Sequence, residues 1–273
     1  MASGSDAASF ETSARAYDRH VGRYGAALAA ELVDFAGVRP GARALDVGCG
    51  PGALTAALVD RVGAGSVAAV DRSASFVAAC RQRLPGVDVR IGSAERLPFA
   101  DGEFDFALSQ LVVNFLDDAR AGVTDMRRVT GDGGVVAACV WDYTGGMTML
   151  RAFWDAALAV DPERAGELDE GRRMRYCRPD ELATLWEAAG LVEVESVPIV
   201  VGAKYENFDD FWSPLPLGVG PSGAYCASLD AATREALRAE CRRRLGSPSG
   251  PFELSARAWA VHGRAPYAKR PWM

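Results

Sequence analysis

The chain has 273 residues, 49% of them hydrophobic and 24% charged, with a formal net charge of −6. This apolar fraction is enough for a buried core and excludes a disordered chain or a low-complexity fibre. The acidic balance argues against a nucleic-acid binder, which needs an excess of Lys and Arg. No apolar run approaches the roughly 20 residues of a membrane span, and the polar N-terminus lacks the apolar core of a secretory signal. We therefore expect a cytoplasmic protein that binds neither nucleic acid nor a membrane.

The six cysteines are scattered along the chain and form no Cys-x-x-Cys pair. Such spacing is not typical of a disulfide framework or of a zinc site. We expect free cysteines in a reducing compartment and no metal. The oligomeric state cannot be inferred from the sequence.

The first part of the chain alternates predicted helices and strands. Helical spacing of apolar residues covers 10–36 and ends at Gly37. Apolar strands are then predicted at 42–47, 66–70, 87–91, 104–111 and 135–140, and helices at 54–62, 75–84 and 117–129. Continuous apolar strands separated by helices indicate a parallel sheet covered on both faces, which is a doubly wound α/β fold.

The second part of the chain is less regular. We predict a helix at 179–189, a strand at 191–201 and, from Phe252, a strand with one polar side, as expected of an antiparallel strand. The fold class is thus a seven-stranded, mostly parallel, Rossmann-like sheet with an antiparallel last strand, in one domain over 1–273. The long insertion at 203–250 has the length of a lid or a binding loop.

In an open α/β sheet, ligands bind at the carboxyl ends of the strands. The first strand ends in a glycine-rich turn that contains Gly48 and Gly50, and the second ends at Asp71, which is placed to accept hydrogen bonds from a ribose. A nicotinamide dinucleotide site would fit these residues. It leaves Asp46 unexplained, because a carboxylate repels a pyrophosphate. A ligand with a cationic amino-acid group could use that charge.

The run from Leu45 to Gly52 resembles the first motif of the class I S-adenosylmethionine-dependent methyltransferases. Residues 92–99, followed by Phe104-Asp105, look like the adenine-flanking loop and fourth strand of that family, and residues 128–134 look like its turn before strand five. The resemblance covers about residues 10–145. It is nearest to the methyltransferases of the ubiquinone and menaquinone type.

The resemblance implies S-adenosylmethionine as the cofactor and S-adenosylhomocysteine as the product. It implies a helical N-terminal lid at 10–36, a cofactor-binding core at 40–145, and segments at 146–178 and 203–250 that shape the acceptor pocket. The cofactor-binding residues carried over are Tyr17, Arg23, Asp46, Gly48, Cys49, Gly50, Asp71, Arg72, Ser93, Ala94, Glu95, Ser109, Gln110 and Leu111. Arg23 suits the methionine carboxylate because its guanidinium can bind bidentately. Many relatives carry Asp where Ser93 stands, so here the adenine amino contact would pass to the Ala94 backbone and a weaker hydroxyl.

Methyl transfer requires alignment of the nucleophile with the S–CH₃ bond and, for some acceptors, removal of a proton. His20, in the expected lid, and Asp142, after strand five, are the candidate general bases. His262 is the other histidine, and we expect it to be structural.

Aromatic residues are frequent after strand five and favour a small, largely hydrophobic acceptor. Two alternatives stay open. One is a protein that binds S-adenosylmethionine without methylating, as a cyclase or a regulator. The other is an NAD(P)-dependent oxidoreductase, which lacks a Tyr-x-x-x-Lys pair here because Asp180 stands four positions after Tyr176. The acceptor atom cannot be read from the sequence.

Overall fold

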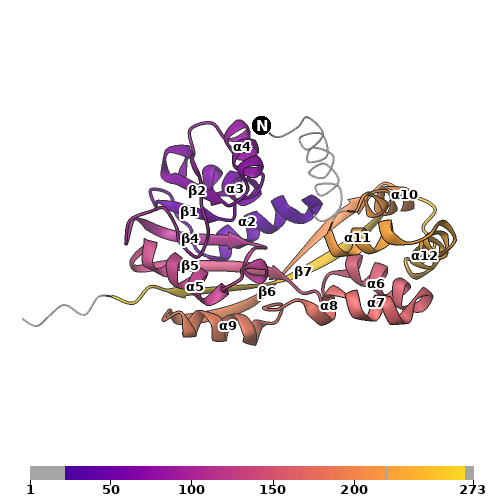
Figure 1. The fold of residues 1–273 in the computed structure, drawn as a ribbon. Helices are drawn as coiled ribbons and strands as arrows, with labels where there is room; N and C mark the ends of the chain where they lie inside the picture. Colours follow the sequence, from indigo (N-terminus) through magenta and orange to yellow (C-terminus); the bar gives the residue numbers. More distant parts are fainter. Residues whose placement is uncertain (1–21, 219, 268–273) are drawn as a thin grey trace, which may run out of the picture. The chain divides into compact units, whose positions relative to one another are not determined.

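The computed structural model describes residues 22–218 and 220–267 (Figure 1). They divide into two compact units. The sheet unit holds Ala26–Trp141, Arg175–Ile199 and the described residues from Ala258 onward. The helical unit holds Asp142–Met174, Val200–Arg257 and the described residues up to Gly25.

One sheet of seven strands is present, in the order β3-β2-β1-β4-β5-β7-β6. The parallel pairs join β1 to both β2 and β4, β2 to β3, and β4 to β5. Strand β7 is antiparallel to β5, with Val135 opposite Arg264 and Trp141 opposite Ala258. The fold class predicted from the sequence is confirmed. The strands are β1 (Ala44–Val47), β2 (Val67–Asp71), β3 (Asp88–Ile91), β4 (Phe104–Gln110), β5 (Thr130–Trp141), β6 (Val192–Tyr205) and β7 (Phe252–Arg264).

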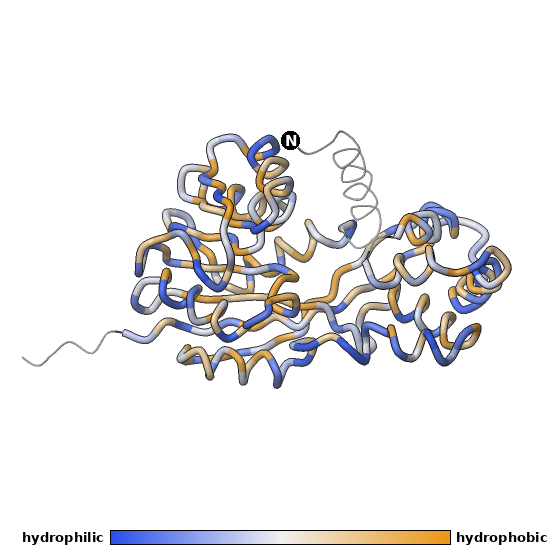
Figure 2. Tube along the Cα trace, in the orientation of Figure 1, coloured by the Kyte–Doolittle hydropathy of each residue, from blue (hydrophilic) through white to orange (hydrophobic). Residues whose placement is uncertain are grey.

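The sheet unit carries helices on both sides of its strands (Figure 1). Helices α3 and α4 pack against β1, β2 and β3, whereas α5 packs against β4, β5 and α9. The side chain of Ser73 caps α4, and that of Asp118 caps α5. Figure 2 shows the strands of this unit as mainly hydrophobic. Its helices are α2 (Gly25–Phe35), α3 (Ala53–Val62), η2 (Ala64–Ser66), α4 (Ala74–Arg83), η3 (Val113–Phe115), α5 (Ala119–Val129) and α9 (Pro179–Ala188).

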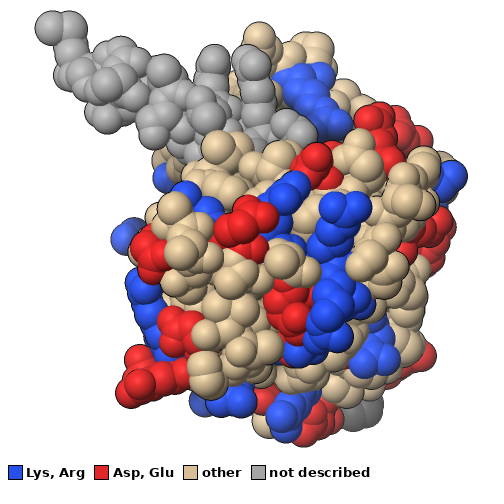
Figure 3. Space-filling view, turned by 90° about the vertical axis from the view of Figure 1, so that its right-hand side faces the viewer, with Lys and Arg blue, Asp and Glu red and all other residues tan. Residues whose placement is uncertain are grey.

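The helical unit has its own apolar core. Phe153 and Trp154 of α6 pack edge to face, and Tyr225 of α11 contacts both rings. On the face drawn in Figure 3, acidic and basic side chains are mixed. In the helical unit, Arg238 forms an ion pair with Asp209. The helices are η1 (Gly22–Tyr24), α6 (Thr148–Val160), α7 (Pro162–Leu168), α8 (Glu170–Arg173), α10 (Phe208–Trp212), η4 (Leu215–Leu217), α11 (Gly220–Ser228) and α12 (Ala231–Arg244).

Strand β5 begins earlier than predicted. We expected a turn at 128–134, but residues 130–134 belong to the strand, and the register against β4 shifts between Phe104 and Phe106. A side chain at Gly134 would come within 2.7 Å of the Asp105 carbonyl oxygen, so the glycines allow the two backbones to approach closely. Within the described part of the chain, no helix is both long enough and apolar enough to cross a bilayer.

Candidate cofactor site

A cavity of about 390 Å³ opens in the sheet unit, beside the segments that follow β1, β2 and β3. Ligand sites of small molecules have this size and lie at this edge of a doubly wound sheet. The cavity brings together six residues predicted from the sequence: Gly48, Asp71, Arg72, Ser93, Ala94 and Glu95. Seven further lining residues were not predicted: Val70, Ser73, Phe76, Gly92, Val112, Phe115 and Leu116.

The glycine-rich turn after β1 is held by its own backbone. The N–H groups of Gly48 and Cys49 donate to the carbonyl of Val70 at 2.8 and 3.0 Å. Gly48 has φ +79°, and a Cβ at this position would lie 2.4 Å from a methyl group of Val112. Only glycine fits there. The side chain of Cys49 is buried in the core with Cys80, and Cys49 does not line the cavity.

Asp71 ends β2 and ties the neighbouring segments together. One carboxylate oxygen accepts a hydrogen bond from the Gly50 N–H at 2.9 Å, and the other accepts one from the Ser73 N–H at 2.8 Å. A carboxylate oxygen can accept more than one hydrogen bond. Asp71 can therefore hold the turn and still accept bonds from ligand hydroxyls.

Asp46 lies at the end of β1 and is fully buried. The Thr55 hydroxyl donates to Oδ2 at 2.6 Å, whereas Oδ1 has no hydrogen-bond donor among the described residues. Burial raises the pKa of this carboxyl to about 7, although the Thr55 hydrogen bond opposes the shift. An unsatisfied buried carboxylate oxygen destabilises a fold, and a cationic donor would compensate it.

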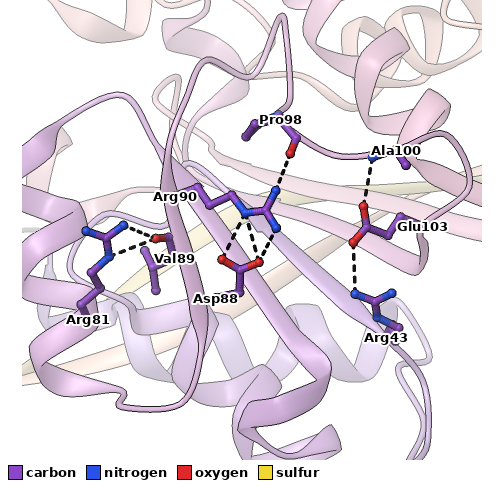
Figure 4. A network of polar contacts seen from close by, with 8 residues as sticks. All are labelled: Arg43, Arg81, Asp88, Val89, Arg90, Pro98, Ala100 and Glu103. Atoms are coloured by element: carbon purple, nitrogen blue, oxygen red, sulfur yellow. Dashed lines mark hydrogen bonds and ion pairs between the residues drawn. The ribbon is translucent and has the colours of Figure 1, made fainter.

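Hydrogen bonds hold the C-terminal part of the loop that follows β3 (Figure 4). Arg90 of β3 pairs with Asp88 and donates a hydrogen bond of 2.6 Å to the Pro98 carbonyl. The Glu103 carboxylate accepts a bond from the Ala100 N–H at 3.0 Å. These contacts hold in place the loop that includes the cavity-lining residues 92–95.

The predicted residues at the end of β4 do not line this cavity. The Ser109 hydroxyl is buried and donates to the Val47 carbonyl at 2.8 Å, which joins β4 to β1. Leu111 has the left-handed φ of 62°, and its N–H donates to the Cys139 carbonyl. Backbone strain of this kind in a residue other than glycine is frequent at functional sites. A cofactor contact of Ser109, Gln110 or Leu111 stays a prediction.

Arg23 belongs to the helical unit, where it is engaged. Its guanidinium binds both carboxylate oxygens of Asp210, at 3.1 and 3.2 Å, and donates to the Lys204 carbonyl at 2.9 Å. It also stacks over the Tyr205 ring, 4.1 Å from its centre. To bind a methionine carboxylate as predicted, Arg23 would have to break its bonds with Asp210 and Lys204.

Asp142, a candidate base, is also paired. Arg257 donates to its Oδ2 from Nε and Nη2, and Thr144 donates to its Oδ1. Burial alone would raise the pKa of Asp142, but the hydrogen bonds from Thr144 and Arg257 outweigh it, and the pKa lies below its ordinary value. A carboxylate of low pKa is a weak base.

Tyr17 and His20, the other lid residues predicted to act, lie outside the described residues. His262 lies in β7, with Nε2 3.4 Å from the Glu195 carboxylate and its ring against Phe35. These contacts are structural. Over 22–218 and 220–267, no group of three or more His, Cys, Asp and Glu side chains could hold a metal ion.

The lining residues that we missed have a recognisable origin. Val112, Phe115 and Leu116 follow β4 directly and form the short helix η3 and its flanks. Phe115 is 53% exposed and lines the cavity. An apolar run that continues past the end of a parallel strand was the available signal.

Comparisons with known proteins identify the family. A family model described as "Methyltransferase domain" matches residues 45–138. The malonyl-[acyl-carrier protein] O-methyltransferase of Salmonella typhimurium is 30% identical over 198 residues, which is 70% of this chain and 76% of that protein. The demethylmenaquinone methyltransferase of Geobacillus stearothermophilus is 30% identical over 181 residues, 60% of this chain and 77% of that protein. The chain belongs to the S-adenosylmethionine-dependent methyltransferases.

Other curated relatives are matched over a smaller part of their length. The chain spans between 34% and 64% of the first five curated relatives. Among solved structures, phosphoethanolamine N-methyltransferase 2 of Haemonchus contortus, in complex with phosphomonomethylethanolamine and S-adenosylhomocysteine, has a TM-score of 0.55 at 15% identity. The match covers 88% of this chain and 52% of that one. This similarity supports the methyltransferase fold.

Proposed function

We propose that this chain transfers a methyl group from S-adenosylmethionine to a small, largely hydrophobic acceptor and releases S-adenosylhomocysteine. The observation that carries the proposal is the fully buried Asp46, whose Oδ1 has no donor among the described residues, two positions before the cavity-lining Gly48. An α-ammonium group is the ligand feature that such an oxygen would bind.

The glycine turn itself speaks against a dinucleotide. A pyrophosphate is held by free backbone N–H groups at such a turn. Here the N–H groups of Gly48, Cys49 and Gly50 all donate to Val70 or Asp71. A phosphate would have to displace these bonds and would also meet the charge of Asp46.

In this proposal, the chain's own residues bind and orient. Asp46 accepts a hydrogen bond from the ammonium of the cofactor, and Asp71 accepts bonds from the ribose hydroxyls. The apolar side chains of Val112, Phe115 and Leu116 exclude water from the cavity. When bound, the cofactor supplies a methyl group on a positively charged sulfur. Since displacement at that carbon needs chiefly alignment, a base is needed only where the acceptor must lose a proton. His20 is the candidate for it, and Asp142, whose pKa is lowered by Thr144 and Arg257, is the weaker alternative.

The acceptor is proposed from residues of the helical unit. The ground for a hydrophobic acceptor is the frequency of aromatic residues after strand five. Phe153, Trp154 and Tyr225 among them are buried in the core of the helical unit. The two relatives described above are named for different acceptors, malonyl-[acyl-carrier protein] and demethylmenaquinone. They support the reaction class and leave the acceptor atom to experiment.

Titration calorimetry of the full chain with S-adenosylmethionine, S-adenosylhomocysteine and NADH tests the proposal. We expect the first two to bind at one site and NADH not to bind. Binding of NADH alone would overturn it. A screen of small apolar acceptors for a methyl mass gain and for S-adenosylhomocysteine release then separates methyl transfer from mere cofactor binding.

The variant Asp71→Ala probes the cofactor role directly. It removes the hydrogen bonds to a ribose and the bond that holds the Gly50 N–H, and we expect S-adenosylhomocysteine to bind about 30-fold or more weakly. Asp60→Ala, at an exposed position of α3, is the matched control and should leave the affinity unchanged. Unchanged affinity in a folded Asp71→Ala protein would contradict the ribose contact.

A further inference from the structure

Two cysteines lie side by side at the glycine turn that follows β1. Cys49 belongs to the turn itself, and Cys80 belongs to α4. Both are members of one buried apolar cluster with Val77, and their thiols share a hydrogen bond. The proposed function gives neither thiol a role. Neighbouring side chains are the first requirement for a disulfide bond, and this pair meets it.

The two thiols differ in reactivity. The hydrogen bond with Cys49 lowers the pKa of the Cys80 thiol most, and burial opposes this shift. The same contact, together with burial, raises the pKa of Cys49. Since the thiolate is the nucleophilic form of a cysteine, Cys80 is the thiol that attacks an oxidant, and Cys49 is the thiol that reacts second.

Access to the pair is restricted. Cys80 is fully buried, and only 6% of Cys49 is exposed. A bulky, charged disulfide such as oxidised glutathione does not reach sulfur atoms in this position. Hydrogen peroxide is small and uncharged, so a local opening of the turn is enough to admit it. The class of oxidant that fits this pair is therefore a small hydroperoxide.

A bond between the two sulfur atoms would displace the turn, because it brings them closer than two separate thiols can approach. The Cys49 N–H donates to the Val70 carbonyl at 3.0 Å. A Cβ at Gly52 would lie 3.1 Å from Sγ of Cys80, so the turn already packs closely against α4. Movement of Cys49 toward α4 would therefore pull on its neighbour Gly48, which lines the cavity.

We propose that Cys49 and Cys80 form a redox-sensitive pair, which a hydroperoxide joins in a disulfide that lowers the affinity of the cavity for its ligand. The Cys80 thiolate attacks one oxygen of hydrogen peroxide, the O–O bond breaks, and hydroxide leaves. The Cys49 sulfur then attacks the sulfenic acid: the S–S bond forms, the S–O bond breaks, and the hydroxyl group leaves with the Cys49 proton as water. The proton lost from Cys80 converts the hydroxide to water. Two thiols and one peroxide thus give one disulfide and two water molecules.

Peptide mapping by mass spectrometry tests the bond itself, on the full chain treated with a small molar excess of hydrogen peroxide. We expect two peptides joined through Cys49 and Cys80, which dithiothreitol separates. In Cys49→Ala the joined pair cannot form, and we expect dimedone to trap the sulfenic acid of Cys80. In Cys80→Ala we expect neither a joined pair nor a dimedone adduct at Cys49. Oxidised wild-type protein without the joined pair would overturn the proposal.

Calorimetry with S-adenosylhomocysteine tests the effect on the cavity, which rests on the proposed function. Oxidised wild-type protein should bind about 10-fold or more weakly than reduced protein, and dithiothreitol should restore the affinity. Cys80→Ala is compared with itself and should bind equally before and after peroxide. Cys139→Ala is the matched control, because Cys139 is fully buried in β5 of the same unit, and it should keep the wild-type response.

The two measurements separate the possible failures. A joined pair with unchanged affinity would overturn the effect on the cavity, and so would a loss of affinity in Cys80→Ala as large as in the wild type. Reduced wild-type protein that binds no S-adenosylhomocysteine would contradict the proposed function, and the peptide mapping would still decide whether the pair forms.

Discussion

Asp46 lowers the stability of the folded chain and is also the residue that we expect to bind the cofactor's ammonium. Its carboxyl is fully buried, and burial raises its pKa from 3.8 to about 7. In the unfolded chain the same group ionises near its ordinary value. Folding therefore works against ionisation of Asp46, and the structure tolerates this cost at the position where we place the ammonium of the cofactor.

This cost predicts the behaviour of Asp46→Asn. The raised pKa destabilises the folded state by an amount that is absent below pH 3.8, grows as the pH rises and is complete above about pH 7. The neutral amide removes that cost. At pH 8 the variant should therefore be more stable than the wild type by a few kcal/mol, because each tenfold change in an ionisation constant corresponds to about 1.4 kcal/mol. Urea unfolding at pH 8 and at pH 5 measures this difference, which should be smaller at pH 5.

The same variant should lose cofactor binding. The amide lacks the charge that pairs with an ammonium, and we expect S-adenosylhomocysteine to bind at least about 10-fold more weakly. A variant that gains stability and keeps full affinity would show that Asp46 does not contact the ligand. Thr55 donates to either side chain, so its hydrogen bond is retained in the comparison.

At the scale of the element, the turn between β1 and α3 depends on the left-handed conformation of Gly48. A Cβ there would lie 2.4 Å from Val112, which itself lines the cavity. Gly48→Ala should lower the free energy of unfolding by about 1–3 kcal/mol and weaken S-adenosylhomocysteine binding, because both the turn and the cavity wall must move. Thermal unfolding and calorimetry check the two effects.

Gly65→Ala is the matched control for this substitution. Gly65 lies in η2 of the same unit, and a Cβ there would meet nothing within 4 Å. We expect unchanged affinity and nearly unchanged stability. Equal behaviour of the two alanine variants would contradict the steric role of Gly48.

At the scale of the whole molecule, the cofactor cavity is lined by the sheet unit alone. Phe153, in contrast, is a fully buried residue of the helical unit. Phe153→Ala should lower the free energy of unfolding by about 3–5 kcal/mol. Under conditions where the variant is folded, its dissociation constant for S-adenosylhomocysteine should stay within about twofold of wild type, because the cavity walls are untouched.

Val77→Ala provides the contrast. Val77 packs with Cys49 beneath the glycine turn, in the sheet unit. Its truncation should lower the free energy of unfolding and weaken the binding of S-adenosylhomocysteine. If Phe153→Ala also changed the affinity strongly, cofactor binding would depend on both units.

The order of the elements could be predicted because short stretches of sequence indicate where each strand and helix begins and ends. The apolar strands of the sheet unit stand out between glycines and helix caps such as Ser73, and β2 and most of β5 are buried on both faces. Helices α6 to α8 and α11 were not predicted. Helix α6 has apolar residues at helical spacing, but α11 begins with Gly220-Pro221, which locally favours a turn. Packing against η4, and to a smaller extent against α6 and α7, stabilises α11 as a helix.

The candidate site divides in the same way. By itself, the sequence determined the fold class, the glycine turn and the carboxylates Asp46, Asp71 and Glu95, because these follow directly from strand ends and short motifs. Only the tertiary structure decided how each side chain is used: Ser109 bonds to Val47, Arg23 to Asp210, and Ser93 to Glu95. A motif specifies which groups are present near a strand end. Which of them remain available to a ligand depends on hydrogen-bond partners that are often distant in the chain and that folding alone brings into contact.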